Sequence, residues 1–185
     1  MIHKGKRGIV HISGKYAVKE KNPASAVNTL AHEAVFLKEV NKHNIGPKLY
    51  RFNNNKITME YINGERIIEY MRKQNKKNIL AVLKKVFDQL LILDKNGINK
   101  EELTNPYKHI IVRNHQPIMI DFERCRKTDN PKNVTQFLQF LRSKKIEKLL
   151  QEKNIFFEKE KIEAIAKEYK KKKNPDALKQ LWRGC

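Results

Sequence analysis

Cysteine is scarce in this sequence, and long apolar runs are missing. Two cysteines in 185 residues, Cys125 and Cys185, cannot supply a disulfide framework, and no CxxC pair or Cys/His spacing typical of zinc ligands occurs. No run of about 18 apolar residues is found, which excludes a spanning helix. The charged stretch 1–7 has no apolar segment behind it, so we expect no signal peptide. These absences predict a soluble chain in the reducing cytoplasm, with no membrane partner.

Acidic residues are also few. The sequence has 20 Asp and Glu but 40 Lys and Arg, which gives a formal net charge of +20. The mean hydropathy of −0.72 could suggest disorder. However, Leu, Ile, Val and Phe make up 51 of the 185 residues, about 28 %, which exceeds the ~20 % guideline for disordered chains. We therefore expect one globular domain with a very basic surface. Nucleic acid, an anionic membrane surface, an acidic protein, nucleotide phosphates and plain solvation all stay open as explanations of the charge.

Strand patterns with one helix occupy the first third of the sequence, and helical patterns dominate the rest. The early strands are expected at 9–12 and 16–19. A helix follows, which Asn22 caps, which begins at Pro23 and which stops at 44–47. After it comes a hairpin of 49–52 and 56–62 around the asparagines 53–55. The later ones are helices at 67–71, at 79–93 and from Val134 onward, with short strands at 109–112 and 117–122. This order predicts an α+β fold in two lobes of one domain, a strand-rich N-terminal lobe of residues 1–62 and a helical C-terminal lobe of residues 63–185.

Two features of the first third suggest phosphate binding. Gly5 and Gly8 enclose a turn whose backbone could approach a phosphate closely. Lys19 ends an apolar strand, where its ammonium could reach a nucleotide's phosphates if a carboxylate anchored it, and Glu33 lies 14 residues further on. Taken separately, an ordinary turn and ordinary surface charges explain these residues as well.

Two further features suggest an adenine edge and a cation site. The strand 57–62 leads toward Gly64 and could offer backbone C=O and N–H groups to adenine. Asp121 follows the apolar run 118–120, and a carboxylate in that position suits Mg²⁺, which prefers oxygen ligands. A plain lobe connector and a turn-capping aspartate are the alternative interpretations.

In this order and at these separations the four features resemble the protein-kinase-like fold. The nearest resemblance is to small archaeal atypical serine/threonine kinases, including the RIO family and the compact kinase of the KEOPS tRNA-modification complex. Residues 102–112 and 120–123 look like a group of archaeal predicted serine/threonine kinases, and the resemblance covers about residues 5–142. It implies an ATP- and Mg²⁺-dependent phosphotransferase that acts on an unknown protein substrate or on itself.

The resemblance also implies a role for each matching residue. The turn of Gly5, Lys6 and Gly8 would cover the phosphates, Lys19 would contact them, and Glu33 would anchor Lys19. Met59 would be the gatekeeper, and the backbones of Glu60 and Ile62 would meet adenine. Glu102 would be the catalytic base, and Asp121 would bind the metal.

Three positions depart from the kinase pattern. Glu123 replaces the glycine of the Asp-Phe-Gly motif and adds a negative charge beside the metal site. Glu102 takes the place of the catalytic aspartate and can still orient a hydroxyl, with Glu101 as its rival. The second metal ligand, normally asparagine, is Tyr107 by strict count and His109 if the loop carries two extra residues. His109 is the predicted ligand.

These departures leave other functions open. An ATPase that switches an assembly fits Glu102 and the short segment after Glu123. A pseudokinase that binds RNA or an RNA–protein complex fits the charge, for example through Lys170–Lys173. A small-molecule kinase of the aminoglycoside or choline type is disfavoured, because those proteins usually have a larger C-terminal lobe with acidic pockets and this C-terminal segment is basic.

Overall fold

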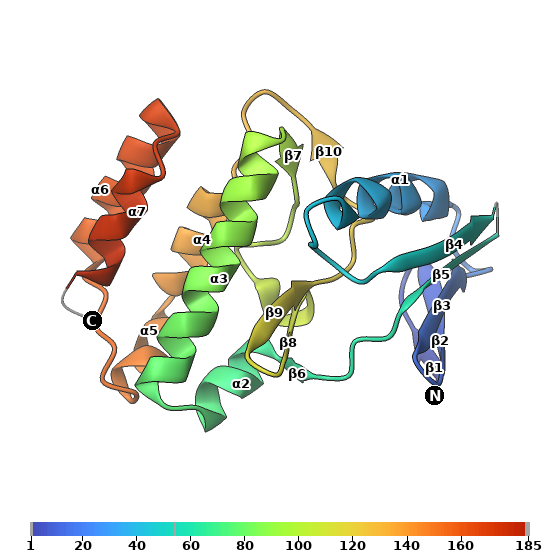
Figure 1. Cartoon of the computed structure of the whole chain (residues 1–185), viewed down its shortest axis with the longest axis horizontal. Coiled ribbons are helices and arrows are strands. Elements are labelled where there is room, and N and C mark those ends of the chain that lie inside the picture. The colour runs from blue at the N-terminus through green and yellow to red at the C-terminus, as the bar shows by residue number, and fades with distance from the viewer. Residues whose placement is uncertain (1, 54, 184–185) are drawn as a thin grey trace. The chain divides into compact units, whose positions relative to one another are not determined.

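The computed structural model describes residues 2–53 and 55–183, so Asn54 of the predicted asparagine turn and Cys185 lie outside the described residues. The chain folds into two compact units. The first consists of Met1–Gly64 with Ile118–Cys125, and the second of Glu65–Pro117 with Arg126–Cys185. The mixture of helices and strands confirms the predicted α+β class (Figure 1). The sequence did not indicate that the segment 118–125 belongs with the first unit.

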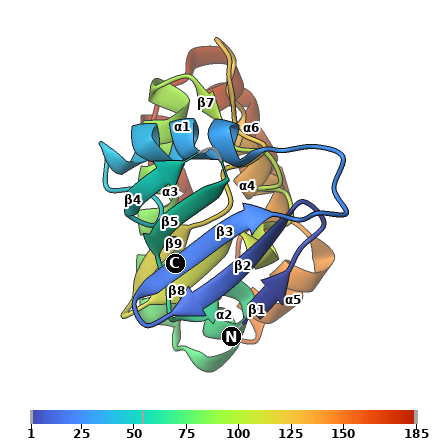
Figure 2. The same cartoon turned by 90° about the vertical axis from the view of Figure 1, so that its right-hand side faces the viewer.

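An antiparallel sheet and one helix make up the first unit (Figure 2). The strand order is β1 (Ile2–Lys4), β2 (Gly8–Ser13), β3 (Tyr16–Lys21), β5 (Lys56–Glu60) and β4 (Leu49–Asn53). Helix α1 (Leu30–Asn41) packs on β3, β4 and β5. Ala17 pairs with Met59 and Lys19 with Ile57, and directly paired residues share one face of a sheet. Because Ala17 and Ile57 are buried, this register places Lys19 on the buried face.

The start of α1 differs from the prediction, because the helix begins at Leu30 rather than at Pro23. Asn22, the expected cap, is used elsewhere. Its side-chain amide donates to the Gly5 carbonyl at 2.8 Å, and its N–H donates to the Arg7 carbonyl at 2.9 Å. A capping asparagine accepts a backbone N–H with its side-chain oxygen, whereas here the amide of Asn22 donates to a backbone carbonyl and holds the glycine-containing turn.

Helices dominate the second unit, as the periodicity predicted. They are α2 (Ile67–Lys73), α3 (Lys76–Lys95), α4 (Asn133–Leu141), α5 (Lys144–Gln151), α6 (Lys159–Lys172) and α7 (Asp176–Lys179), with 3₁₀ turns at Pro106–Lys108 and Gln180–Trp182. Short strands pair in the order β6 (Glu65–Arg66), β8 (Ile110–Arg113), β9 (Gln116–Met119), and β7 (Ile98–Asn99) pairs with β10 (Arg126–Lys127). The Asn75 side chain caps α3 by accepting the N–H of Asn78 at 2.9 Å.

A buried polar network joins three helices of the second unit. One oxygen of Asp94 on α3 accepts the backbone N–H and the side-chain amide of Asn133 on α4, at 3.1 and 2.6 Å. The other accepts the hydroxyl of Tyr169 on α6 at 2.9 Å. Burial, together with the Asp94 carboxylate, raises the pKa of Tyr169, so its hydroxyl stays a donor. Each buried polar group of this network therefore has a partner, as a stable core requires.

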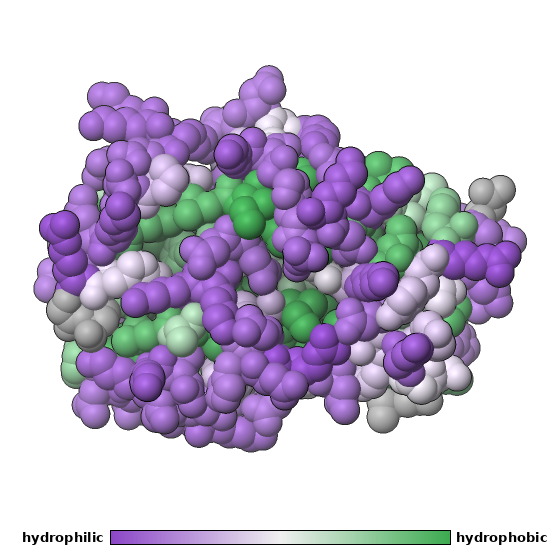
Figure 3. Space-filling model, viewed as in Figure 1, coloured by the Kyte–Doolittle hydropathy of each residue, from purple (hydrophilic) through white to green (hydrophobic). Residues whose placement is uncertain are grey.

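Hydrophilic residues cover most of the face in Figure 3, with apolar patches between them. Among the described residues no helix is both long and apolar enough to cross a membrane.

Gly46, just after α1, allows close packing of the segment that carries Asp121. Its φ is +79°, and a Cβ at this position would lie 2.8 Å from the Phe122 ring and 3.2 Å from Leu37. Phe122 is buried and separates the two carboxylates Asp121 and Glu123 in the sequence. The absence of a side chain at Gly46 therefore helps to seat this segment in the first unit.

We expect Gly46→Ala to lower the free energy of unfolding by about 2–3 kcal/mol, because it combines a left-handed backbone with overpacking against Phe122. Gly14→Ala is the matched control, since Gly14 has φ +55° but nothing within 4 Å of its added Cβ. It should lose only about 1 kcal/mol. Urea unfolding of both variants measures the difference, and equal losses would contradict the packing role.

Candidate functional site

The Lys19 ammonium lies among three carboxylates of the first unit. Its Nζ is 2.6 Å from Glu33 Oε2, 3.2 Å from Asp121 Oδ1 and 3.4 Å from Glu123 Oε2. The Lys19 side chain is only 9 % exposed. Burial by itself would lower the pKa of Lys19, but the attraction of Glu33, Asp121 and Glu123 outweighs it and raises this pKa above its usual value. The ammonium therefore stays charged at neutral pH.

Local structure explains how Lys19 reaches Glu33. Alternation along β3 turns Lys19 toward the buried face, and Glu33 lies in the first turn of α1. The Lys19 stem passes directly over Gly8, where a Cβ would lie 2.8 Å from Lys19 Cε. Gly8 therefore has a structural reason besides any contact with phosphate.

Burial is the largest influence on Glu33, and it raises the pKa of this carboxyl, while the charge of Lys19 acts in the opposite direction. The carboxylates of Asp121 and Glu123 raise the same pKa further. Glu33 depends on Lys19 for its charge balance, because an isolated buried carboxylate is strongly unfavourable.

Asp121 carries both exposure and backbone strain. Its φ is +64°, in the left-handed region that non-glycine residues seldom adopt and that often marks functional sites. Its side chain is 35 % exposed, against 9 % for Lys19. One oxygen each of Glu33, Asp121 and Glu123 lies within 4.8 Å of the others. Such oxygen ligands fit a hard cation such as Mg²⁺.

The glycine-containing turn closes on itself through a hydrogen bond from the Gly5 N–H to the Gly8 carbonyl at 2.8 Å. The Lys6 carbonyl within it accepts from the Asn22 side chain at 3.4 Å. Asn22 was predicted to cap the first helix, and no role was predicted for Arg7. Arg7 Nη1 lies 3.4 Å from Glu123 Oε1.

The predicted adenine edge lies at the end of β5. Met59 pairs with Ala17 across the sheet. The Glu60 N–H donates to the Lys48 carbonyl at 2.8 Å, so this amide already serves the sheet. The backbone of Ile62, which the resemblance also assigns to adenine, follows two residues after the end of β5.

The second unit places Glu102 beside His109. Glu102 has φ +72°, and its Oε2 lies 3.3 Å from His109 Nε2. Glu101, the rival base, is more exposed and contacts Arg126 at 3.5 Å. Backbone strain and a partly buried partner therefore distinguish Glu102 from Glu101.

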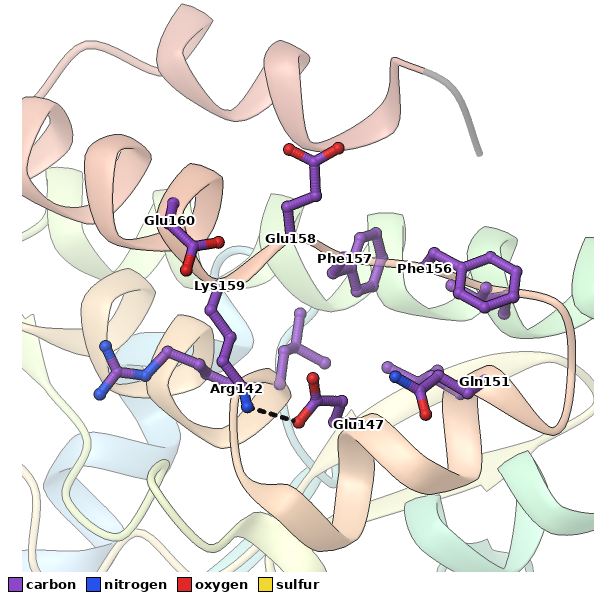
Figure 4. A pocket seen from close by; sticks show the side chains of 11 residues that line it. Arg142, Glu147, Gln151, Phe156, Phe157, Glu158, Lys159 and Glu160 are labelled. Carbon is purple, nitrogen blue, oxygen red and sulfur yellow. Dashed lines mark ion pairs between the residues drawn. The ribbon is translucent and has the colours of Figure 1, made fainter.

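A separate pocket of about 300 Å³ lies in the second unit between α5 and the start of α6 (Figure 4). The Lys159–Glu147 ion pair, at 3.0 Å, crosses it, and the largely exposed ring of Phe156 lines it. None of its lining residues is a predicted site residue.

Solved structures share the fold of this chain. One is the ADP/Mg²⁺-phosphoaspartate complex of the Rio2 kinase from Chaetomium thermophilum, with a TM-score of 0.60 and 13 % sequence identity. The match covers 98 % of this chain and 68 % of the Rio2 chain. A second Rio2 structure from that organism has a TM-score of 0.57 and 15 % identity, over 98 % of this chain and 69 % of the other. The bifunctional kinase-methyltransferase WbdD matches with a TM-score of 0.53 and 17 % identity, over 72 % of this chain and 34 % of its own.

The chain therefore has a protein-kinase-like fold with RIO-type structural relatives, as the sequence predicted. No family model matches it. An uncharacterized protein of Methanocaldococcus jannaschii, MJ1211, is 31 % identical over 116 residues, which are 61 % of this chain and 99 % of that protein. The chain belongs to the same family as MJ1211.

We expect Lys19→Met to lower the free energy of unfolding by about 3–5 kcal/mol at pH 8, because it strands Glu33 as a buried carboxylate. The loss should be smaller at pH 5. Lys19 lowers the pKa of Glu33 against the effect of burial, so without Lys19 this pKa lies further above the unfolded value than in the wild type. The variant therefore loses more stability than the wild type as the pH rises through that folded pKa. Urea unfolding at the two pH values measures this.

The double variant Lys19→Met/Glu33→Gln is the control. It removes the buried carboxylate, so most of the extra loss at pH 8 should disappear. A loss for Lys19→Met that is equal at pH 5 and pH 8 would contradict the dependence of Glu33 on Lys19.

Proposed function

We propose that this chain is an ATP- and Mg²⁺-dependent phosphotransferase of the atypical serine/threonine protein kinase type. The observation that supports it most is the buried Lys19 ammonium, within hydrogen-bond distance of both Glu33 and Asp121. Lys19 comes from β3, Glu33 from α1 and Asp121 from the segment 118–125. They follow one another along the chain in the order of the kinase motifs. The structural relative Rio2 kinase, seen as an ADP/Mg²⁺-phosphoaspartate complex, supports the same ligands for this chain.

The proposed division of labour follows from charge. The Lys19 ammonium neutralises phosphate charge, and Glu33 holds that ammonium in place. Asp121 would hold the cation with Glu33 and Glu123 nearby. When bound, Mg²⁺ neutralises charge that develops on the phosphates. Gly5, Lys6 and Gly8 would cover the phosphates, and Met59 with the backbones of Glu60 and Ile62 would meet adenine.

Glu102 is the proposed base, which orients the attacking hydroxyl. Its strained backbone and its contact with His109 support this choice over Glu101. The same contact suits His109 for orienting Glu102, in addition to the metal role that the resemblance implies.

Two phosphoacceptors suit the proposed site. A protein hydroxyl gives a kinase, and water gives an ATPase, with the same residues in the same roles. The net charge of +20 supports an RNA or RNA–protein partner for the surface. Within the run Lys170–Lys173, however, Lys173 donates to the Pro131 carbonyl at 2.7 Å, so not every lysine of the run is directed at a partner.

Nucleotide binding is tested by thermal shift with ATP and Mg²⁺. We expect the wild type to be stabilised, and Asp121→Asn to lose the Mg²⁺-dependent part of the shift together with turnover. Its melting temperature without ligand should stay nearly unchanged, because asparagine tolerates a positive φ. Asp88→Asn, on the exposed face of α3, is the control that should behave as wild type. Unchanged turnover in Asp121→Asn would remove the metal role.

The base is tested with γ-labelled ATP. Glu102→Gln should slow phosphate transfer by about 10²–10⁴-fold and leave nucleotide affinity nearly unchanged, because a general base acts in the transition state. Glu101→Gln is the matched control and should keep wild-type turnover. The reverse pattern would make Glu101 the base. Label on protein, as opposed to label released as phosphate, distinguishes kinase from ATPase.

A further inference from the structure

Glu123 connects three elements of the first unit from the position where the kinase motif has glycine. Its Oε1 lies 3.4 Å from Arg7 Nη1 in the glycine-containing turn. Its Oε2 lies 3.4 Å from Lys19 Nζ on β3 and accepts the hydroxyl of Thr29, just before α1, at 3.4 Å. The side chain is 13 % exposed. Both carboxylate oxygens are therefore directed into the site.

The two cations that Glu123 contacts both belong to the predicted phosphate site. Lys19 is the proposed phosphate contact, and its stem lies against Gly8 of the turn that would cover the phosphates. Arg7 lies within that same turn. Glu123 therefore already contacts the two cations that an incoming phosphate would bind.

The charge count of this cluster is unfavourable for a bare polyanion. Arg7 and Lys19 face three carboxylates, those of Glu33, Asp121 and Glu123. A nucleotide that arrives without a cation brings further negative charge next to these three carboxylates. Like charges at such distances repel strongly in a partly buried setting.

We propose that Glu123 is an internal counter-anion that takes the place of phosphate on Arg7 and Lys19, so that the site accepts a nucleotide only together with a divalent cation. This inference rests on the proposed nucleotide-binding function. A metal-free phosphate must compete with Glu123 for both cations. A phosphate that carries a divalent cation instead presents positive charge to Asp121 and Glu123, so their repulsion becomes attraction. Glutamate in place of glycine thus makes nucleotide affinity depend on the cation.

The test compares wild type with Glu123→Gln by calorimetric titration of ADP and of inorganic pyrophosphate, each in EDTA and in Mg²⁺. Glutamine keeps the size of the side chain and removes its charge. Without metal, Glu123→Gln should bind both ligands about tenfold or more tightly than wild type does, because the competing anion is gone. With Mg²⁺ the gain should shrink or reverse, so the ratio of the Kd in EDTA to the Kd in Mg²⁺ falls by about tenfold.

Glu20→Gln is the matched control. Glu20 follows Lys19 on β3 but points to the opposite face, where it pairs with Lys56 at 2.8 Å. This variant removes the same charge from the neighbouring residue and should keep the wild-type ratio. An equal change in Glu20→Gln would reduce the effect to net charge and overturn the proposal.

The two ligands separate this proposal from the function on which it rests. If Glu123→Gln leaves metal-free binding unchanged or weaker while ADP binds with Mg²⁺, the counter-anion is wrong and the nucleotide function stands. If pyrophosphate binding tightens as expected but ADP binds no better than pyrophosphate to either protein, the counter-anion stands and the nucleotide function is wrong. If neither ligand binds to any of the proteins, both are wrong.

Discussion

The buried ammonium of Lys19 is the constraint on which the first unit depends. A cation that is only 9 % exposed must have charged partners at short range, since desolvation would otherwise dominate its energy. Glu33 can supply one only if α1 lies against β3, and the missing side chain at Gly8 leaves room for the stem of Lys19. The segment 118–125 supplies the other carboxylates and belongs to the same unit. One ion-pair cluster thus relates the sheet, the helix and the segment 118–125.

Local rules placed Lys19 at the end of an apolar strand and Glu33 on the helix that follows. They allowed the two to pair, but ordinary surface charges explained both residues equally well. Only the order of the four features, which resembles the kinase motifs, assigned Lys19, Glu33 and Asp121 to one site. The same rules failed at the start of α1. Asn22 followed by Pro23 is a common helix signal, but Asn22 instead holds the turn of Gly5 and Arg7.

Contacts between distant parts of the sequence were beyond those rules. Arg7 and Glu123 are 116 positions apart, and neither residue type nor spacing indicates that they meet. The departure of Glu123 from the kinase pattern was visible in the sequence, but its consequence was not, because that depends on which cations it contacts. The positive φ of Glu102 and Asp121 likewise has no sequence signal, since glycine or asparagine is the usual choice there.

The overall charge and the charge of the cluster act in opposite directions. A net charge of +20 raises the concentration of every polyanion near the surface, whatever its identity. Long-range attraction of this kind cannot distinguish nucleotide from RNA, or metal-bound phosphate from bare phosphate. Discrimination has to come from charges that touch the ligand, and in the proposed site these include the carboxylates of Glu33, Asp121 and Glu123 beside the cations Arg7 and Lys19. In so basic a chain, these carboxylates would give the proposed phosphate site its selectivity among the anions that the surface attracts.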